Sequence, residues 1–258
     1  MTQWDPDQYE RYKTYRDRPA LDLMLRIPDD LEPRQIWDLG CGTGEHAAVL
    51  ALRHPTAQVF GVDQSPDMLK VARGRTTARV TWIEGDVAAF SPPSPPDLIF
   101  TNAALQWLPD HEALFPRLVA HLSPGGVFAC QLPISFEEAW HRHLRETAAS
   151  GAWAEKLANV RGVLPTARPE DYYAWLSPLA DVDIWSTTYL HILTGPDPVT
   201  EWMKGTGLRP YLERLTDPDA REAFLDAYRA RTAKTFVRTE TGETLFPFPR
   251  LFMIARRG

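Results

Sequence analysis

The residues with the clearest chemical potential lie between positions 35 and 47, in the stretch QIWDLGCGTGEHA. Its glycines alternate at Gly40, Gly42 and Gly44, directly after a short apolar run. Glycine carries no Cβ and tolerates positive φ, so a ligand can approach this backbone closely. The apolar stretch that starts at Ala47 predicts a helix, whose free N–H groups and dipole would face the same ligand. The pattern predicts a strand, a loop and a helix that together hold a ligand.

An acidic residue stands at a suitable distance from this loop. Asp63 lies about 20 residues further on, where a carboxylate at a strand end can accept both hydroxyl hydrogens of a ribose. The spacing is GxGxG rather than the GxGxxG of nicotinamide-binding proteins, because the third glycine comes one residue early. The loop alone is a weak signal. Combined with Asp63, the Gly85-Asp86 pair and Asn102, each at the end of a predicted strand, it becomes a strong one.

Strands and helices alternate around these positions. A helix is predicted from Pro19 with Leu21, Met24 and Leu25 on one face, and another after the Ser65 cap. Such alternation predicts a mostly parallel sheet with helices on both faces, which binds ligands beyond the carboxyl ends of its strands. The predicted strands lie at 36–39, 58–63, 80–83, 97–100 and 127–130, with a sixth near 182–184 and a last at 251–256.

Composition restricts the class of protein. The 258 residues suit one α/β domain with insertions, and the net charge of −6 without a basic block argues against a nucleic-acid partner. No apolar run approaches the roughly 18 residues that span a bilayer, which predicts a cytoplasmic protein without a membrane partner. Cys41 and Cys130 lack pairing or CxxC spacing and are expected to be buried thiols. His141 and His143 suggest no third metal ligand, so exposed helix histidines are expected and no metal is predicted.

Several motifs resemble those of a known family. DLGCGTG, VDQSP, EGDV and DLIFTNAALQW are similar to the S-adenosylmethionine-dependent methyltransferases of the Rossmann-like class, type 11. Thr43 departs from the resemblance, because the family usually has proline there, and should change loop stiffness rather than chemistry. Longer runs resemble one member family, trans-aconitate 2-methyltransferase: W-x-P-x-x-Y from Trp4, RDRPA at 16–20, LQWLPDHEALFPRL at 105–118, VDIWSTTYLH at 182–191, TGLRPYL at 206–212 and FPRLFMIARR at 248–257.

The resemblance implies a fold and a cofactor, S-adenosyl-L-methionine. The fold would be a single methyltransferase domain over 1–258, with a seven-stranded mostly parallel sheet whose last strand is antiparallel. An N-terminal arm, 1–18, and helical cap insertions at about 135–178 and 192–246 would accompany it. The implied cofactor contacts are Asp38, Gly40, Gly42 and Gly44 for the methionine end, Asp63 for the ribose, Gln64 and Met68 beside the adenine, Asp86 and Val87 at its edge, and Asn102 and Ala103 near the sulfonium. Asp38 as a backbone cap and Met68 as plain core remain open.

The implied acceptor is a small polycarboxylate. A carboxylate oxygen is already ionised near neutral pH, since an unperturbed carboxylic acid has a pKa of about 4, so no general base is required and no catalytic residue is predicted. The enzyme must instead align the oxygen, exclude water and neutralise the other carboxylates, for which arginine is suited. The candidate substrate-binding residues are Tyr9, Arg16, Arg18, Trp107, Tyr189, His191, Arg209, Tyr211 and Arg250.

Three alternatives remain open. Trp107 could be plain core. A type 11 methyltransferase could act on another small acid or on a hydroxyl, and a hydroxyl acceptor would need a base such as His191. A non-catalytic module that binds S-adenosylmethionine belongs to a different class. The sequence does not determine the oligomeric state.

Overall fold

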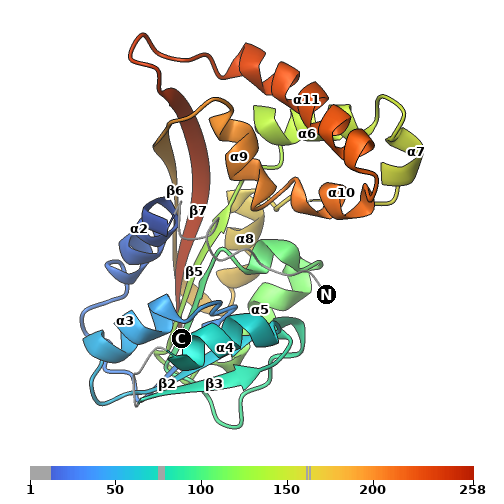
Figure 1. The fold of residues 1–258 in the computed structure, drawn as a ribbon. Helices are drawn as coiled ribbons and strands as arrows, with labels where there is room; N and C mark the ends of the chain where they lie inside the picture. Colours follow the sequence, from blue (N-terminus) through green and yellow to red (C-terminus); the bar gives the residue numbers. More distant parts are fainter. Residues whose placement is uncertain (1–12, 75–78, 161, 163) are drawn as a thin grey trace.

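A seven-stranded sheet with the order β3-β2-β1-β4-β5-β7-β6 runs through the computed structural model, which describes residues 13–74, 79–160, 162 and 164–258 (Figure 1). Strands β1 to β5 are parallel, while β7 is antiparallel to both of its neighbours. The predicted mostly parallel sheet with an antiparallel last strand is therefore confirmed. Its strands are β1 (Gln35–Leu39), β2 (Gln58–Asp63), β3 (Val80–Glu84), β4 (Leu98–Asn102), β5 (Val127–Pro133), β6 (Ala180–Leu193) and β7 (Thr244–Arg257).

Helices cover both faces of this sheet. On one face α2 (Lys13–Met24) and α3 (Glu45–Arg53) form an apolar core with β1, β4, β5 and β7. On the other face α5 (His111–His121) and α8 (Pro169–Leu176) form a second apolar core with the sheet. Helix α4 (Pro66–Gly74) packs against β2 and β3 on the α3 side, where a Cβ on Gly44 would meet both Ala72 of α4 and Trp82 of β3. The central strands β4 and β5 are buried on both sides, which explains why both are continuous apolar runs.

Helix α2 differs from its prediction in extent and orientation. Pro19 lies inside the helix rather than at its start. Leu21 and Leu25 are 44% and 75% exposed, whereas Met24 is buried as predicted, together with Ala20 and Leu23. Apolar residues at helical spacing occur on both faces of this segment, so periodicity alone could not choose between them. The predicted arm largely precedes α2, and its residues 1–12 lie outside the described part of the chain.

Strands β6 and β7 extend well beyond the rest of the sheet. They pair with each other from Ala180↔Arg257 to Leu193↔Thr244, whereas β5 pairs with β7 only as far as Pro133↔Arg250. Residues 188–193 and 244–249 therefore form a two-stranded ribbon that continues past the carboxyl end of β5. Figure 1 shows this ribbon rising from the sheet toward a group of helices.

These helices form a cap around the ribbon. They share an apolar core, here called the cap cluster, that includes Trp140, Trp202, Phe224, Tyr228 and Phe246. No described helix combines the length and the apolar character that a membrane span requires. The cap helices are α6 (Ala139–Ala148), α7 (Ala154–Leu157), α9 (Pro198–Lys204), α10 (Arg209–Arg214) and α11 (Pro218–Thr235).

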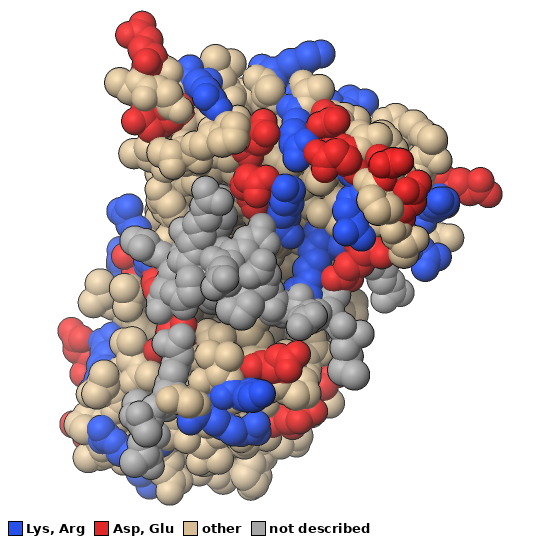
Figure 2. Space-filling model, viewed as in Figure 1, with Lys and Arg blue, Asp and Glu red and all other residues tan. Residues whose placement is uncertain are grey.

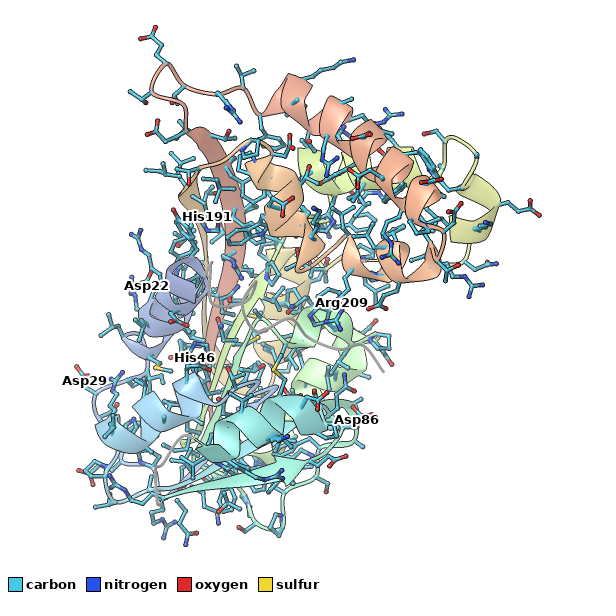
Figure 3. All side chains as sticks on the ribbon, in the orientation of Figure 1. Asp22, Asp29, His46, Asp86, His191 and Arg209 are labelled. Carbon is cyan, nitrogen blue, oxygen red and sulfur yellow. The ribbon has the colours of Figure 1, made fainter. Side chains whose placement is uncertain are left out.

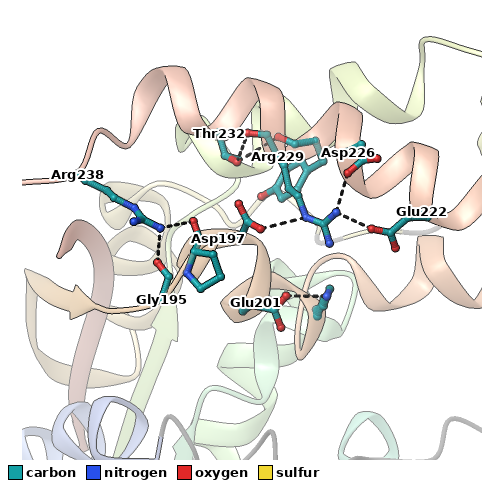
Figure 4. A network of polar contacts seen from close by, with 11 residues as sticks. Gly195, Asp197, Glu201, Glu222, Asp226, Arg229, Thr232 and Arg238 are labelled. Atoms are coloured by element: carbon teal, nitrogen blue, oxygen red, sulfur yellow. Dashed lines mark hydrogen bonds and ion pairs between the residues drawn. The ribbon is translucent and has the colours of Figure 1, made fainter. Parts of the chain in front are cut away.

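Polar contacts fix α11 to the turn before α9. Arg229 of α11 forms ion pairs with Asp197, Glu222 and Asp226, at N···O distances of 3.6, 2.6 and 2.7 Å (Figure 4). Arg238, after the helix, donates to the carbonyl oxygens of Gly195 and Pro196, both at 2.6 Å. The segment that returns to β7 is thereby held against the segment that leaves β6.

The cap does not contain the whole predicted insertion 135–178. Helix α8, within that range, packs against α5 and β6 on the face of the sheet. Tyr172 and Leu176 of α8 are fully buried there, and the Tyr172 hydroxyl lies 2.5 Å from Nδ1 of His111. Two large apolar side chains on one helical turn gain more by covering the sheet than by joining the cap, which explains the difference.

The cap cluster should make a large contribution to stability. Trp140 is fully buried, with ring centroids 4.5 Å from Phe246 and 5.4 Å from Phe248. We expect Trp140→Ala to lower the free energy of unfolding by about 3–5 kcal/mol, through lost burial and a remaining cavity. Tyr173→Ala, at a position that is 54% exposed, is the matched control and should change it by less than about 0.5 kcal/mol. Equal losses in urea denaturation of the two variants would contradict this assignment.

Candidate functional site

The glycine loop joins β1 to α3, and its three glycines have left-handed backbone conformations. Gly40, Gly42 and Gly44 have φ values of 73°, 54° and 84°. A Cβ on Gly40 would lie 2.3 Å from Cβ of Ala104, and one on Gly44 would lie 2.4 Å from Cη2 of Trp82. A Cβ on Gly42 would meet nothing within 4 Å. Gly40 and Gly44 are therefore required by packing, whereas Gly42 borders open space that a ligand can enter.

Asp63 fastens this loop to the start of α4. Its Oδ2 accepts a hydrogen bond from the Gly42 N–H, and its Oδ1 accepts one from the Ser65 N–H, both at 2.9 Å. Each carboxylate oxygen can accept a second bond, so the side chain retains acceptor capacity. The predicted cap of α4 is confirmed, because Ser65 Oγ accepts from the Met68 N–H at 3.4 Å.

A row of polar side chains crosses one face of the sheet near the strand ends. Asp38 pairs in register with Phe100, two residues before Asn102; Asn102 pairs with Gln131. Gln131 pairs with Phe252, two residues from Arg250. Residues two apart on a strand point to the same face, so Asp38, Asn102, Gln131 and Arg250 all point toward the α2 side. Thr101, on the opposite face, links β4 to β1 by donating to the Leu39 carbonyl oxygen at 2.9 Å.

The polar row is buried and incompletely hydrogen-bonded. Asp38, Gln131 and Arg250 are 1%, 0% and 4% exposed. Within the described residues, Asp38 Oδ2, Asn102 Oδ1 and Gln131 Nε2 have no hydrogen-bond partner. An unsatisfied buried polar group costs about 1–3 kcal/mol, so native proteins rarely retain several side by side. This part of the sheet could therefore hold a polar ligand that supplies the missing partners.

Burial changes the electrostatics of Asp38. Desolvation raises the pKa of this carboxyl to about 7, partly offset by the nearby His46 and increased by the charge of Asp63. The Ala47 N–H donates to the carboxylate and favours its ionised form. His46 itself lies 3.6 Å from Oδ1 of Asp17. Asp38 is therefore a carboxyl group poised to ionise when a cation approaches.

The other predicted cofactor residues lie along the same edge of the sheet. Ala103 has a φ of 53°, which is uncommon for a residue other than glycine, and its carbonyl oxygen accepts from Gln106 Nε2 at 2.6 Å. Asp86 is exposed and accepts from the Ala88 N–H at 2.8 Å, while Val87 is buried. Gln64 is exposed, and Met68 is only 8% exposed.

Three predicted substrate residues come together on the ribbon. Arg250 Nη1 donates to Gln131 Oε1 at 3.5 Å, and its Cζ lies 4.4 Å from the ring centroid of Phe248. Tyr189 donates its hydroxyl hydrogen to Asp22 Oδ2 at 2.7 Å. His191 points to the same face of β6 as Tyr189, because the two are separated by one residue. The guanidinium of Arg18 covers the Tyr189 ring at 5.4 Å.

The remaining substrate candidates lie elsewhere. Arg209 and Tyr211 belong to α10, where Arg209 Nε pairs with Glu213 Oε1 at 3.0 Å and Tyr211 is buried in the cap cluster. Figure 3 places Arg209 at the lower edge of the cap, away from His191. Figure 2 shows basic side chains gathered between the cap and the part of the molecule that contains the sheet. Trp107 is 48% exposed, so the plain-core alternative is wrong. Tyr9 and the Arg16 side chain lie outside the described residues.

The histidine and cysteine expectations have mixed outcomes. Cys41 and Cys130 are buried free thiols, as expected, and burial raises the pKa of both. The expectation that His141 is exposed is wrong. It is only 7% exposed, and burial together with Arg145 lowers its pKa to about 4. In the part of the chain that the structure describes, no group of three acidic, histidine or cysteine side chains could hold a metal ion.

Sequence reasoning missed several residues of this region. Gln131 was not singled out, although a glutamine within the apolar run VFACQLP is a usable signal of a buried polar function. Tyr15 and Asp22 of α2 were also missed, and they contact His191 and Tyr189 across 176 and 167 sequence positions respectively. Local sequence patterns contain no information about such long-range contacts.

Known proteins resemble this chain along its full length. A family model described as a methyltransferase domain matches residues 36–126. A trans-aconitate 2-methyltransferase of Azoarcus sp. (strain BH72) is 45% identical over 100% of both chains, and that of Methylobacterium nodulans is 44% identical over 100% of this chain and 99% of its own. The trans-aconitate 2-methyltransferase of Streptomyces coelicolor is 44% identical over 98% of this chain and 86% of its own.

Solved structures share the fold at low sequence identity. The YcgJ protein from Bacillus subtilis has a TM-score of 0.60 and 16% identity, covering 93% of this chain and 98% of its own. A Haemonchus contortus phosphoethanolamine N-methyltransferase 2, solved with phosphomonomethylethanolamine and S-adenosylhomocysteine, has a TM-score of 0.56 and 17% identity. It covers 93% of this chain and 53% of its own. These likenesses establish the methyltransferase fold.

The raised pKa of Asp38 predicts a pH-dependent stability. The folded protein retains this proton up to about pH 7, whereas the unfolded chain releases it near 3.8, so the free energy of unfolding falls as pH rises between these values. Asp38→Asn cannot ionise and should lack this fall. In urea denaturation at about pH 4.5 and pH 8, the wild type should lose on the order of 3 kcal/mol relative to the variant. The same pH dependence in both proteins would contradict the assignment.

Proposed function

The chain belongs to the trans-aconitate 2-methyltransferase family, and from this premise we propose that it esterifies a carboxylate of trans-aconitate or a close small polycarboxylate. Its cofactor is S-adenosyl-L-methionine, which supplies a methyl group bound to a positively charged sulfur. The observation that supports this proposal best is the buried pair of Arg250 and Gln131, which lies on the same face of the sheet as Asp38 Oδ2 and Asn102 Oδ1, two atoms without a hydrogen-bond partner among the described residues. The predicted cytoplasmic location and the predicted absence of nucleic-acid, membrane and metal partners stay predictions.

The polar atoms near the glycine loop fit this cofactor. Asp38 Oδ2, buried and without a partner in the described structure, is suited to the ammonium of the methionine end. Gly42 leaves room for close approach, and Asp63 has acceptor capacity for ribose hydroxyls. Asn102 is the last residue of β4, and its Oδ1 has no hydrogen-bond partner among the described residues. We assign the cofactor to this edge, with Gly40, Gly44, Gln64, Met68, Asp86, Val87 and Ala103 as its further neighbours.

The acceptor would lie beside the cofactor, over the ends of β5 and β7. Arg250 can neutralise one carboxylate, and its guanidinium is already oriented by Gln131 and by the Phe248 ring. Gln131 Nε2 is a buried donor without a partner in the described residues, aimed at the same region. The cap would exclude water from this space, which strengthens each of these interactions. Tyr189, Arg18 and the more distant Arg209 would complete the acceptor side.

A carboxylate acceptor also fits the absence of a strong base among the described ribbon residues. His191 would be the base for a hydroxyl acceptor, but burial and the charge of Arg250 lower its pKa to about 3. Such a weak base removes a hydroxyl proton poorly at neutral pH. A carboxylate needs no proton removed, so the residues only have to align its oxygen with the methyl carbon and neutralise its remaining charge.

A transfer assay tests the function directly. Purified protein is incubated with methyl-labelled S-adenosylmethionine and trans-aconitate, cis-aconitate, isocitrate or citrate, and labelled ester is separated from unreacted cofactor. We expect ester with trans-aconitate as the preferred acceptor. Ester only with an unrelated acid or alcohol would overturn the acceptor assignment, and binding without any transfer would indicate a non-catalytic module.

Gly42 and Gly125 form a matched pair for testing the cofactor position. Both have positive φ, at 54° and 77°, and a Cβ on either would meet no protein atom within 4 Å. Alanine at either site should cost a similar 1–2 kcal/mol or so of stability. Only Gly42→Ala should weaken binding of S-adenosylhomocysteine, by about tenfold or more, measured by calorimetry. Equal affinities in the two variants would remove Gly42 from the site.

Arg250→Gln tests the acceptor position. Losing a charge-assisted hydrogen bond to a carboxylate costs about 2 kcal/mol, so KM for trans-aconitate should rise roughly 30-fold while cofactor affinity stays near normal. Arg256→Gln is the control, since Arg256 lies on the same strand but pairs with Asp30 at 2.8 Å in a more exposed position. The assignment fails if both variants have wild-type KM values.

A further inference from the structure

His191 lies inside an aromatic enclosure on the ribbon. It is 1% exposed, and its ring is 4.6 Å from Tyr15 of α2, 4.6 Å from Trp202 of α9 and 5.4 Å from Phe248 of β7, measured between centroids. The rings of His191 and Phe248 are stacked at 11°. Three elements besides its own strand therefore contribute to the surroundings of this one side chain.

Both ring nitrogens of His191 lack hydrogen-bond partners in the described structure. A neutral imidazole carries one donor and one acceptor. A buried donor or acceptor that makes no hydrogen bond costs about 1–3 kcal/mol of stability. A phenylalanine would occupy the same apolar enclosure without this cost. Packing therefore does not explain why this residue is a histidine. A ligand that supplies a hydrogen-bond partner to the ring does explain it.

The charged surroundings of His191 are dominated by Arg250. Tyr15 faces the ring from α2, but its hydroxyl donates to the Ile192 carbonyl oxygen at 2.7 Å. Tyr189, on the same face of β6, donates to Asp22, and α9 contributes the uncharged Trp202. Burial and the guanidinium of Arg250 keep the imidazole neutral, with a pKa lowered to about 3. No carboxylate of the described residues contacts the ring to offset this effect.

We propose that His191 binds a second carboxylate of the acceptor and takes up one proton from solvent as it does so. The inference rests on the proposed function, and it makes His191 a residue that selects polycarboxylates over monocarboxylates. One carboxylate neutralises Arg250, which removes the charge that repels an imidazolium, and another lies against the ring and favours its protonated form. Ester formation itself neither consumes nor releases a proton, so His191 returns its proton to solvent when the product leaves.

Calorimetry measures this proton directly. Trans-aconitate is titrated into the full-length protein saturated with S-adenosylhomocysteine, at about pH 7.5, in two buffers with different ionisation enthalpies. The acid is fully ionised at that pH, and any cofactor-linked change at Asp38 is already complete, so a buffer-dependent heat reports uptake by the acceptor site. We expect fractional proton uptake that increases as the pH is lowered from about 7.5 toward 6, and an affinity that falls as the pH rises.

Three variants separate recognition from a structural role. His191→Phe should melt at the wild-type temperature or above, yet lose the proton uptake and raise KM for trans-aconitate about tenfold or more with a smaller change in kcat. His191→Gln retains a neutral donor and should also lose the uptake, which keeps the test decisive if the phenylalanine variant does not fold. His143→Gln is the control, because His143 pairs with Thr235 in the cap at 2.8 Å, and it should retain the uptake.

The possible outcomes separate a failure of the role of His191 from a failure of the proposed function. Trans-aconitate that binds and is methylated without a buffer-dependent heat overturns the role of His191 alone. Uptake that persists in His191→Phe or His191→Gln also overturns it. A protein that neither binds nor methylates trans-aconitate refutes the proposed function, and the inference is refuted with it.

Discussion

The antiparallel pairing of β6 with β7 is the interaction on which the acceptor side depends. This pairing continues beyond the end of β5, where no other strand of the described residues adjoins it. The cap cluster covers the resulting ribbon on the face that contains Phe246 and Phe248. Arg250 and His191 occupy that same face. A ribbon of two strands is marginal alone in water, so its register and its polar side chains are held in place by the aromatic rings packed on it.

The candidate site contains buried polar groups without partners next to polar groups that are hydrogen-bonded. Asp38, Gln131 and His191 each retain a polar atom without a partner in the described structure, and each is almost completely removed from water. Their neighbours are well satisfied: Asp63 accepts two backbone N–H groups, and Tyr189 is fixed by Asp22. The fold therefore loses stability at the groups that we propose to face ligands, while their neighbours are held in place by hydrogen bonds.

Much of this architecture follows from local sequence, and the rest does not. The strands and the glycine loop could be predicted because buried parallel strands are continuous apolar runs and because alternating glycines mark a left-handed turn. The buried face of α2 could not, since Leu21 and Leu25 compete with Leu23 and Met24 at helical spacing. The likeness to known proteins indicates Arg250 and His191 as candidates, but only the register of β5, β6 and β7 reveals that Gln131 lies beside Arg250. The enclosure of His191 by Tyr15 and Trp202 likewise depends on contacts between residues far apart in the sequence.

Residues 194–243, which contain α9 to α11, connect β6 to β7 as one long insertion in a hairpin. Arg229 and Arg238 close the base of this insertion by holding its departing and returning ends together. The part of the insertion that does not pack on the ribbon can thus vary in length without disturbing the strand register, whereas Trp202 and the other rings of the cap cluster must stay in place. Such modularity would allow evolution to change the acceptor while the methyl-donor half of the enzyme stays constant.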